Sequence, residues 1–420
     1  MFPIDQRTLS YLNENGDMLF CYFSLGLLLQ IPVTVMRYFL VDNLGLGPAD
    51  LAEVAALVAF PWAVKPFTAF LSENIVSRCV QRRFQIAFAY GLSGFAWLGF
   101  LLPSNFLASG KLTGCLFLAF LSSFFNSFAD VCLDACMVRR VRLYPDLNGN
   151  GRLQSFVLAS RAFGGLVGSF LSGLFALLSN PFLFIGLIHV VGFVAGWKLK
   201  SLPVQPNVGR LHQSTCKMCS ETLKALLYSE RIIFIAVLFA IATPVSDFAI
   251  MQYFYQHEKG VRPMTFSAAD VIASVMMIAA SLFFNAFLRQ RPWQSVVMLS
   301  QCVLLVVLST NMLLLTGLLQ IDASVYLIVR NIISPFFGHI GFMPLAVRAA
   351  DLVPVGLEGT FYSLYMSTVN LGSVVSEELS GLLTRVLGTN TKSAILCYYI
   401  IATVHNMFSY LTFHLAYGQG

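Results

Sequence analysis

The sequence predicts an all-α membrane protein of about twelve transmembrane helices, arranged as two six-helix halves. Three observations predict this fold: the composition, the spacing of the apolar segments and an internal repeat. Of the 420 residues, 57% are hydrophobic and only 11% are charged. A soluble domain carries roughly a quarter charged residues, which solvate its exterior. Charges this sparse indicate an exterior that faces lipid, and they exclude a multidomain soluble enzyme.

Apolar segments long enough to cross roughly 30 Å of hydrocarbon recur along the whole chain. In the first half we expect spans at 17–40, 49–71, 84–103, 112–137, 154–178 and 181–199. In the second half we expect spans at 232–255, 266–287, 294–316, 322–348, 357–385 and 391–416. A polar stretch without an apolar run separates the two sets. We therefore predict a six-helix bundle at 1–200, a linker at 201–231 and a second six-helix bundle at 232–420.

An internal repeat supports this division. Residues 155–174 align without gaps on residues 363–382, and both pieces contain the run Leu-Ser-Gly-Leu. By helix order these are the fifth and eleventh segments, where a duplication of six helices would place them. The chain thus resembles the plan of the major facilitator superfamily, in which two parallel six-helix repeats form the molecule. Similar small-residue packing in two unrelated membrane helices is the alternative explanation.

The Lys and Arg residues predict the orientation in the membrane. Most of the 26 fall in the N-terminal segment, in the predicted linker or in loops on the same side as these. Cytoplasmic loops carry such an excess, so we expect both termini and the linker in the cytoplasm.

Charged residues inside the predicted helices are the main candidates for function. They are Arg37, Glu53, Lys65, Asp130, Asp134, Arg161, Asp247, Asp270, Arg330, Glu377 and Glu378. An ionisable group in a bilayer costs about 2.5–3.5 kcal/mol on insertion scales, so such groups mark a solute pathway or an ion pair. All of them fall on segments that would line the central path of the superfamily plan.

Four of these residues should lie together in the cytoplasmic third of the first half. They are Lys65, Asp130, Asp134 and Arg161. Asp130 and Asp134 are four residues apart and so share one helix face. For Lys65, Asp130 and Arg161 two roles stay open: binding an anionic or zwitterionic substrate or a coupling proton, or forming a gate ion pair. For Asp134, nearer the cytoplasmic end, we favour the gate.

A second group belongs to the other half and lies from mid-membrane outward. We assign Asp247, Arg330 and Glu377 to substrate binding or proton coupling, because substrates of such proteins bind near the bilayer midplane. Arg37 and Glu53 lie near the outer end, where extension of their long side chains to the interface is the simplest interpretation.

Four motifs resemble those of one known family. The second segment reads PWAVKPFTAFLSE at 61–73, and the fourth reads ADVCLDACMVRRVR at 129–142. The fifth reads LQSFVLASRAFGGLVGSFLSG at 153–173, and the passage at 352–372 reads LVPVGLEGTFYSLYMSTVNLG. These motifs run along the chain and resemble those of the folate–biopterin transporters of the major facilitator superfamily.

The resemblance implies uptake of folates, biopterin or related pteridines with proton coupling. The residues at matching motif positions are Lys65, Asp130, Asp134, Arg161, Glu358 and Asn370. A pterin ring presents an amidine-like N–H edge that a carboxylate can accept in paired hydrogen bonds. The anionic glutamate tail of a folate suits Arg or Lys.

A further set is assigned to a gate or structural charge network. It comprises Glu73, Asp134, Arg139, Glu358 and Asn370. This chain departs from the family pattern at Arg139, where the family has Glu, and at Glu73, where it has Asp. Arg139 thus has the opposite charge to the family residue at the cytoplasmic end. Gating and substrate preference can therefore differ from those of the family.

Two other kinds of function remain as alternatives. One is a carrier of another organic solute, such as S-adenosylmethionine or a nucleoside. The other is a membrane receptor or a membrane-embedded enzyme, but the sequence has no Walker loop, HExxH or GxSxG motif. We expect no enzyme activity, no cofactor and no metal. The expected partners are a small-molecule substrate and membrane lipids, not nucleic acid. We expect a monomer in the plasma membrane, with an organelle membrane as the alternative.

Overall fold

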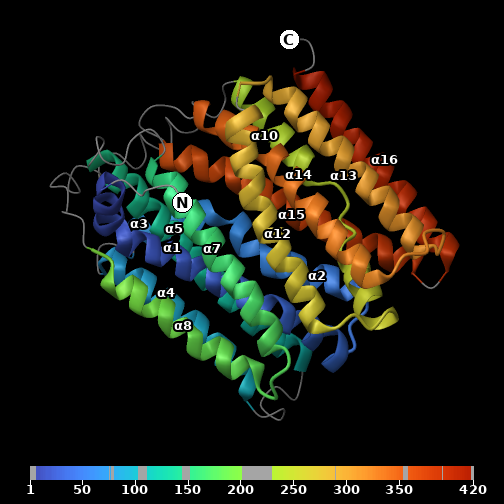
Figure 1. The fold of residues 1–420 in the computed structure, drawn as a ribbon, viewed down its shortest axis with the longest axis horizontal. Helices are drawn as coiled ribbons and strands as arrows, with labels where there is room; N and C mark the ends of the chain where they lie inside the picture. Colours follow the sequence, from blue (N-terminus) through green and yellow to red (C-terminus); the bar gives the residue numbers. More distant parts are fainter. Residues whose placement is uncertain are drawn as a thin grey trace.

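A computed structural model describes residues 6–74, 76, 80–102, 111–143, 152–200, 229–288, 290–352, 358–389 and 391–417. The first half contains α1 (Gln6–Tyr38), η1 (Phe39–Asn43), α2 (Pro48–Ala63), α3 (Lys65–Asn74), α4 (Arg82–Leu98), η3 (Gly99–Leu101), α5 (Lys111–Leu143), α7 (Arg152–Phe175) and α8 (Pro181–Lys198). The second half contains α10 (Ser229–Ala242), α11 (Phe248–Tyr253), η5 (Phe254–Glu258), α12 (Pro263–Phe283), η6 (Phe284–Leu288), α13 (Trp293–Leu315), α14 (Ala323–Asp351), α15 (Glu358–Leu387) and α16 (Lys392–Tyr417). In Figure 1 the blue-to-green helices gather on one side and the yellow-to-red helices on the other.

Among the described residues, eight helices are long and apolar enough to cross a membrane. They span Glu14–Asn43, Arg82–Leu101, Leu112–Met137, Phe156–Phe175, Pro181–Lys198, Pro263–Leu288, Trp293–Leu315 and Ala323–Ala349. These confirm eight of the predicted spans to within a few residues.

The four other predicted spans are helical as well. Two fold as single helices, α15 with 30 residues and α16 with 26. The remaining two, 49–71 and 232–255, are each broken into a pair of helices. Of the predicted linker 201–231, all but 229–231 lies outside the described residues.

The first broken span is interrupted at Val64, between α2 and α3. Pro66 has no N–H to donate to the Trp62 carbonyl four residues earlier. Asn370 of α15 donates to that carbonyl instead, at 3.0 Å. The break makes Lys65 the first residue of α3, with its ammonium 4.6 Å from the centre of the Trp62 ring.

The second break separates α10 from α11, with residues 243–247 in a non-helical conformation. Pro244 cannot donate to the Ala240 carbonyl, and the Thr243 hydroxyl donates to it at 3.2 Å. This interruption lies near the middle of the span predicted at 232–255.

Side chains of neighbouring helices donate hydrogen bonds to the backbone carbonyls of this break. The Ser376 hydroxyl of α15 donates to the Pro244 carbonyl, and the Tyr398 hydroxyl of α16 donates to the Ser246 carbonyl at 2.5 Å. Lipid offers no hydrogen bonds, so irregular backbone at membrane depth is tolerated only where protein or water supplies them. The break is thus attached to α15 and α16.

The repeated helices α7 and α15 occupy equivalent places. Helix α7 packs on α1 and on α12, and α15 packs on α10 and on α2. A Cβ at Gly164 would lie 2.0 Å from the Phe23 carbonyl oxygen of α1. At the aligned Gly372 it would lie 2.5 Å from the Ala242 Cβ of α10. Each repeated helix therefore approaches the first helix of its own half closely.

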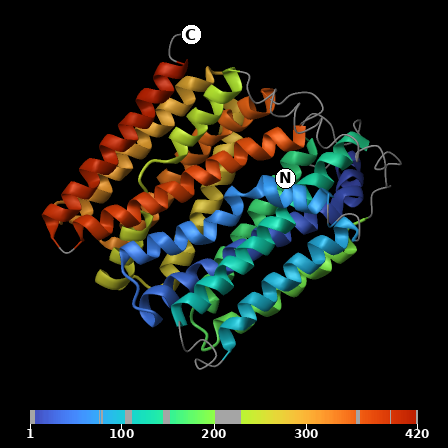
Figure 2. The ribbon, with the colours of Figure 1, turned by 180° about the vertical axis from the view of Figure 1, so that it is seen from behind.

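The same two helices also contact the opposite half. A Cβ at Gly173 would lie 2.3 Å from the Ser267 Cβ of α12, and one at the aligned Gly381 would lie 3.2 Å from the Ala49 carbonyl oxygen of α2. Figure 2 shows α15, in orange, lying beside the blue α2. The aligned glycines thus make equivalent contacts, which favours duplication over chance similarity.

Ion pairs join the halves at one end of the bundle, which we call the loop face: the end where α1 and α15 finish and α2 and α12 begin. Arg37 of α1 pairs with Asp270 of α12 at 2.6 Å. Arg385 of α15 pairs with Asp50 at 3.1 Å and with Glu53 at 2.6 Å, both on α2. Arg37 and Glu53, for which extension to the interface was the simplest interpretation, each bind a partner in the other half.

The opposite end, where α1 begins and α16 finishes, is called the terminal face. Here Arg140 pairs with Asp17 at 2.8 Å, and Arg348 pairs with Glu230. Each of these pairs lies within one half. Across the described part of the chain, then, ion pairs between the halves lie at the loop face.

Candidate functional site

In the first half, one carboxylate is held by two cations. Asp130 of α5 accepts from Lys65 at the α2–α3 break and from Arg161 of α7, the latter at 3.1 Å. The Asp130 side chain is only 1% exposed. A buried carboxylate needs such partners, because desolvation of the unpaired charge costs several kcal/mol. Three of the four residues that we predicted to lie together, Lys65, Asp130 and Arg161, are therefore in contact, and we call these three the Asp130 cluster.

Asp134 lies one helical turn from Asp130, toward the terminal face. The Tyr22 hydroxyl of α1 donates to its carboxylate at 2.7 Å. Asp134 is exposed although it contacts α1 inside the bundle, and the Arg161 side chain is 32% exposed. Protein therefore does not fully cover this side of the Asp130 cluster.

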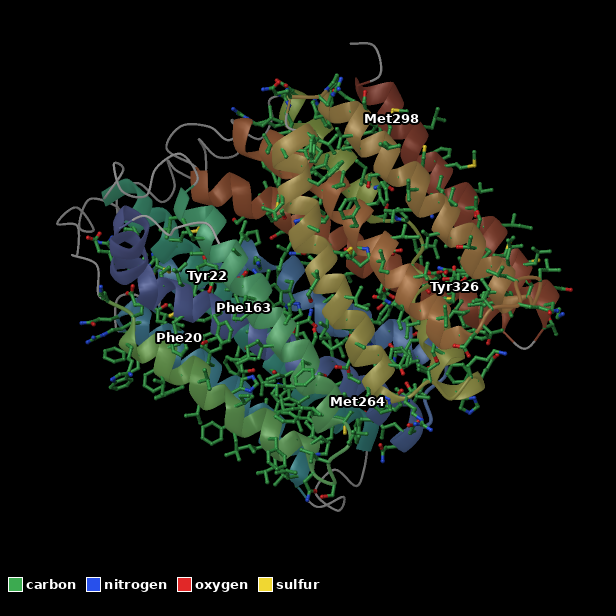
Figure 3. The ribbon with its side chains drawn as sticks, in the orientation of Figure 1. Phe20, Tyr22, Phe163, Met264, Met298 and Tyr326 are labelled. Atoms are coloured by element: carbon green, nitrogen blue, oxygen red, sulfur yellow. The ribbon has the colours of Figure 1, made fainter. Side chains whose placement is uncertain are left out.

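A second carboxylate, Asp247, lies buried at the break between α10 and α11. It accepts from Asn311 of α13 at 2.6 Å, from Tyr399 of α16 at 3.1 Å and from Arg330 of α14 at 3.2 Å. The Tyr326 hydroxyl in turn donates to the Asn311 amide oxygen at 2.7 Å. We call Asp247, Arg330, Asn311 and Tyr399 the Asp247 cluster. Figure 3 labels Tyr22 and Tyr326, which lie in different halves of the molecule.

Glu377 of α15 lies next to the Asp247 cluster. Its carboxyl group lies close to Ser246 and Asp247 at the break. The carboxyl oxygen Oε2 is buried and has no hydrogen-bond partner among the described residues. Glu377, assigned from the sequence to substrate binding or proton coupling, thus lies beside the break, but it does not join the Asp247–Arg330 ion pair.

Helix α15 runs past both clusters. Asn370 contacts the α2–α3 break that presents Lys65, and Glu377 contacts the α10–α11 break. These two residues are seven apart, which puts them on the same helix face about 10 Å apart along the axis. Between the clusters themselves, no ion pair occurs among the described residues.

The remaining predicted residues are less informative. Arg139 is half-buried on α5, toward the terminal face. Glu73 and Glu358 begin or end their helices, but their side chains lie outside the described residues. The sequence interpretation missed Tyr22, Asn311 and Tyr399, which bind the carboxylates. These are uncharged, and their only signal in the sequence is a polar group within an apolar segment.

Comparison with known proteins identifies the family. A family model described as the BT1 family matches residues 25–416. The chain belongs to the BT1 family. Membership confirms the family predicted from the motifs, and it makes the chain a membrane transporter and not an enzyme.

Similar proteins carry names of the same kind. A folate-biopterin transporter of Synechocystis sp. is 29% identical over 397 residues, covering 91% of this chain and 77% of the relative. Folate transporter 1 of Plasmodium falciparum is 27% identical over 377 residues, covering 87% and 72%. A probable folate-biopterin transporter of Arabidopsis thaliana, number 8 and described as chloroplastic, is 24% identical over 378 residues, covering 86% and 68%.

Solved structures confirm the fold of this BT1 family member. The nucleoside transporter NupG aligns with a TM-score of 0.67 at 12% identity, covering 96% of this chain and 99% of that chain. A D-xylose–proton symporter aligns with a TM-score of 0.65 at 13% identity, covering 96% and 97%. At these identities the likeness concerns the fold alone, which is that of the major facilitator superfamily.

Proposed function

We propose that this chain carries folate- or biopterin-type pteridines across a membrane by alternating access, in symport with protons. Family membership and the names of the relatives support the substrate class. The observation that carries the proposal is the Asp130 cluster, in which one carboxylate and two cations lie beside the solvent-exposed Asp134.

The chemistry of the cluster suits a ligand with both kinds of polar group. The N–H edge of a pterin can donate two parallel hydrogen bonds to a carboxylate. An anionic tail can replace that carboxylate as the partner of Lys65 or Arg161. Without substrate, Asp130 pairs with both cations, which leaves the cluster with one excess positive charge. Substrate binding then exchanges ion-pair partners.

The distribution of the inter-half contacts supports alternating access. The halves are paired at the loop face, whereas Asp134, on the side of the Asp130 cluster nearer the terminal face, is exposed. With both termini in the cytoplasm, as the Lys and Arg distribution predicts, this arrangement faces the cytoplasm. We propose further that the chain acts as a monomer, with the plasma membrane as its default location and an organelle membrane as the alternative.

Uptake of labelled folic acid, biopterin and S-adenosylmethionine into a transport-deficient host, at acidic and neutral pH, tests the proposal. We expect pteridine uptake that increases at acidic pH. Asp130→Asn and Arg161→Ala should each lower it by about tenfold or more, because losing one partner of a buried charge pair costs about 2–5 kcal/mol.

Arg262→Ala is the matched control, because Arg262 is exposed and precedes α12 at the loop face. It should leave uptake and surface expression unchanged. Unchanged uptake in both Asp130→Asn and Arg161→Ala would contradict the role of the cluster. Uptake of S-adenosylmethionine alone would contradict the substrate class.

A further inference from the structure

Among the described residues Glu377, which is half-buried with a fully buried Oε2, differs from the buried Asp130 and Asp247 in having no cation partner. Asp130 is bound by two cations and Asp247 by one. The Glu377 carboxyl group lies close to Ser246, and its Oε2 atom is buried without a hydrogen-bond partner in the part of the chain that the structure describes. An ionised carboxylate in such a place would be a buried, uncompensated charge.

The groups that face Glu377 do not offer that compensation. At the α10–α11 break its charged neighbour is Asp247, whose charge is already balanced by Arg330. On α16 its neighbour is Tyr398, whose hydroxyl donates to the Ser246 carbonyl.

The charged residues on the other helices that pack against α15 already have partners. On α2, Glu53 is bound by Arg385. On α3, Lys65 is bound by Asp130. Protonation is therefore the way to neutralise Glu377 in this arrangement.

We propose that Glu377 takes up and releases the transported proton. The proposal rests on the proton symport proposed above and names the residue that performs it. Glu377 lies ten residues before the end of α15 at Leu387, about 15 Å from the loop face and so near the middle of the bilayer. A carboxyl group at this depth stays neutral when protein encloses it and ionises when water reaches it. Alternating exposure to the two sides would thus move one proton per cycle.

The surroundings of Glu377 give protonation a mechanical consequence. Ser376 and Glu377 are consecutive: Ser376 donates to the Pro244 carbonyl, and the Glu377 carboxyl group lies close to Ser246. Four residues further along α15, Gly381 lies against Ala49 of α2 in the opposite half. Gain or loss of the proton therefore changes an attachment of the broken helix next to the surface where the halves meet.

Labelling with N,N′-dicyclohexylcarbodiimide tests the protonation without any substrate, because this apolar reagent modifies protonated carboxyl groups in apolar sites. We expect mass spectrometry of the purified protein to find an adduct at Glu377 at neutral pH, with a yield that falls as the pH rises. Ion-paired Asp130 and Asp247 and exposed Glu378 should stay unmodified. Absence of a Glu377 adduct, or a yield that does not depend on pH, would overturn the proposal.

Proteoliposomes test the coupling. Glu377→Gln should keep pteridine counterflow but lose accumulation driven by a pH gradient by about tenfold or more, whereas Glu377→Asp should keep part of the pH dependence. Glu378→Gln, the adjacent and exposed control, should keep both activities. Gradient-driven accumulation by Glu377→Gln at the wild-type level would overturn the proposal. Absence of pteridine counterflow in the wild type would instead contradict the proposed function, and carbodiimide labelling would still decide the role of Glu377.

Discussion

Asp247 illustrates how a buried carboxylate in this protein depends on a complete set of donors. Arg330 supplies the charge, and Asn311 and Tyr399 supply hydrogen bonds from two other helices. Removing one member of a buried ion pair costs about 3–5 kcal/mol, because the other charge is left uncompensated. Replacing both members by neutral groups costs much less.

We therefore predict that Arg330→Met strongly lowers the thermal stability of the purified protein, and that adding Asp247→Asn to the same chain restores much of it. Thermal unfolding in detergent, followed by intrinsic fluorescence, measures both variants. Strictly additive losses in the double variant would contradict the ion pair seen between Asp247 and Arg330.

At the residue scale, the sequence predicts contacts within a half better than contacts between halves. Lys65, Asp130 and Arg161 could be grouped because helix direction fixes their depth in the membrane. The pairing of Arg37 with Asp270 could not, because it joins residues 233 positions apart in different halves. To predict this ion pair one must know how the two bundles pack against each other. The periodicity of apolar residues in a helix does not give that packing.

The positions of the helices along the chain follow closely from the positions of the apolar segments in the sequence. The predicted span 112–137 coincides with Leu112–Met137, and α15 and α16 match their predicted ranges to within a few residues. The helix breaks at Val64 and 243–247 were less predictable. Proline marks a site where a helix kinks or breaks, but the outcome depends on side chains of other helices, such as Asn370 and Ser376, that bind the freed carbonyls.

The close packing of α7 on α1 predicts how a substitution between these two helices affects stability. Gly164→Ala would place a methyl group 2.0 Å from the Phe23 carbonyl oxygen, so the helices must separate. We expect a loss of about 1–3 kcal/mol in stability, measured as a lower midpoint of thermal unfolding. Gly338→Ala in α14 is the control, since a Cβ there meets nothing within 4 Å. Equal midpoints for the two variants would contradict the close approach of α7 to α1.

For the whole molecule, the important feature is the asymmetry between its two ends. Besides the ion pairs of Arg37 and Arg385, Gln256 of η5 donates to Asp42 of η1 at 2.9 Å, again across the halves at the loop face. The sequence predicts the two halves through the repeat, but it does not specify which end is closed. That depends on the relative free energies of two packings of the same bundles, which a small number of contacts can shift.

We propose that the two halves alternately close the loop face and the terminal face around the charged clusters. Distances between pairs of spin labels test this proposal. One pair is placed on the loop face at Asn43 and Lys259, and the other on the terminal face at Gln81 and Gln290; all four residues are exposed. Combining Arg37→Ala with Arg385→Ala removes ion pairs between the halves and should shift the population toward an open loop face. We predict that the first distance then lengthens while the second shortens. Distances that stay unchanged, or that change in the same direction at both faces, would contradict the claim.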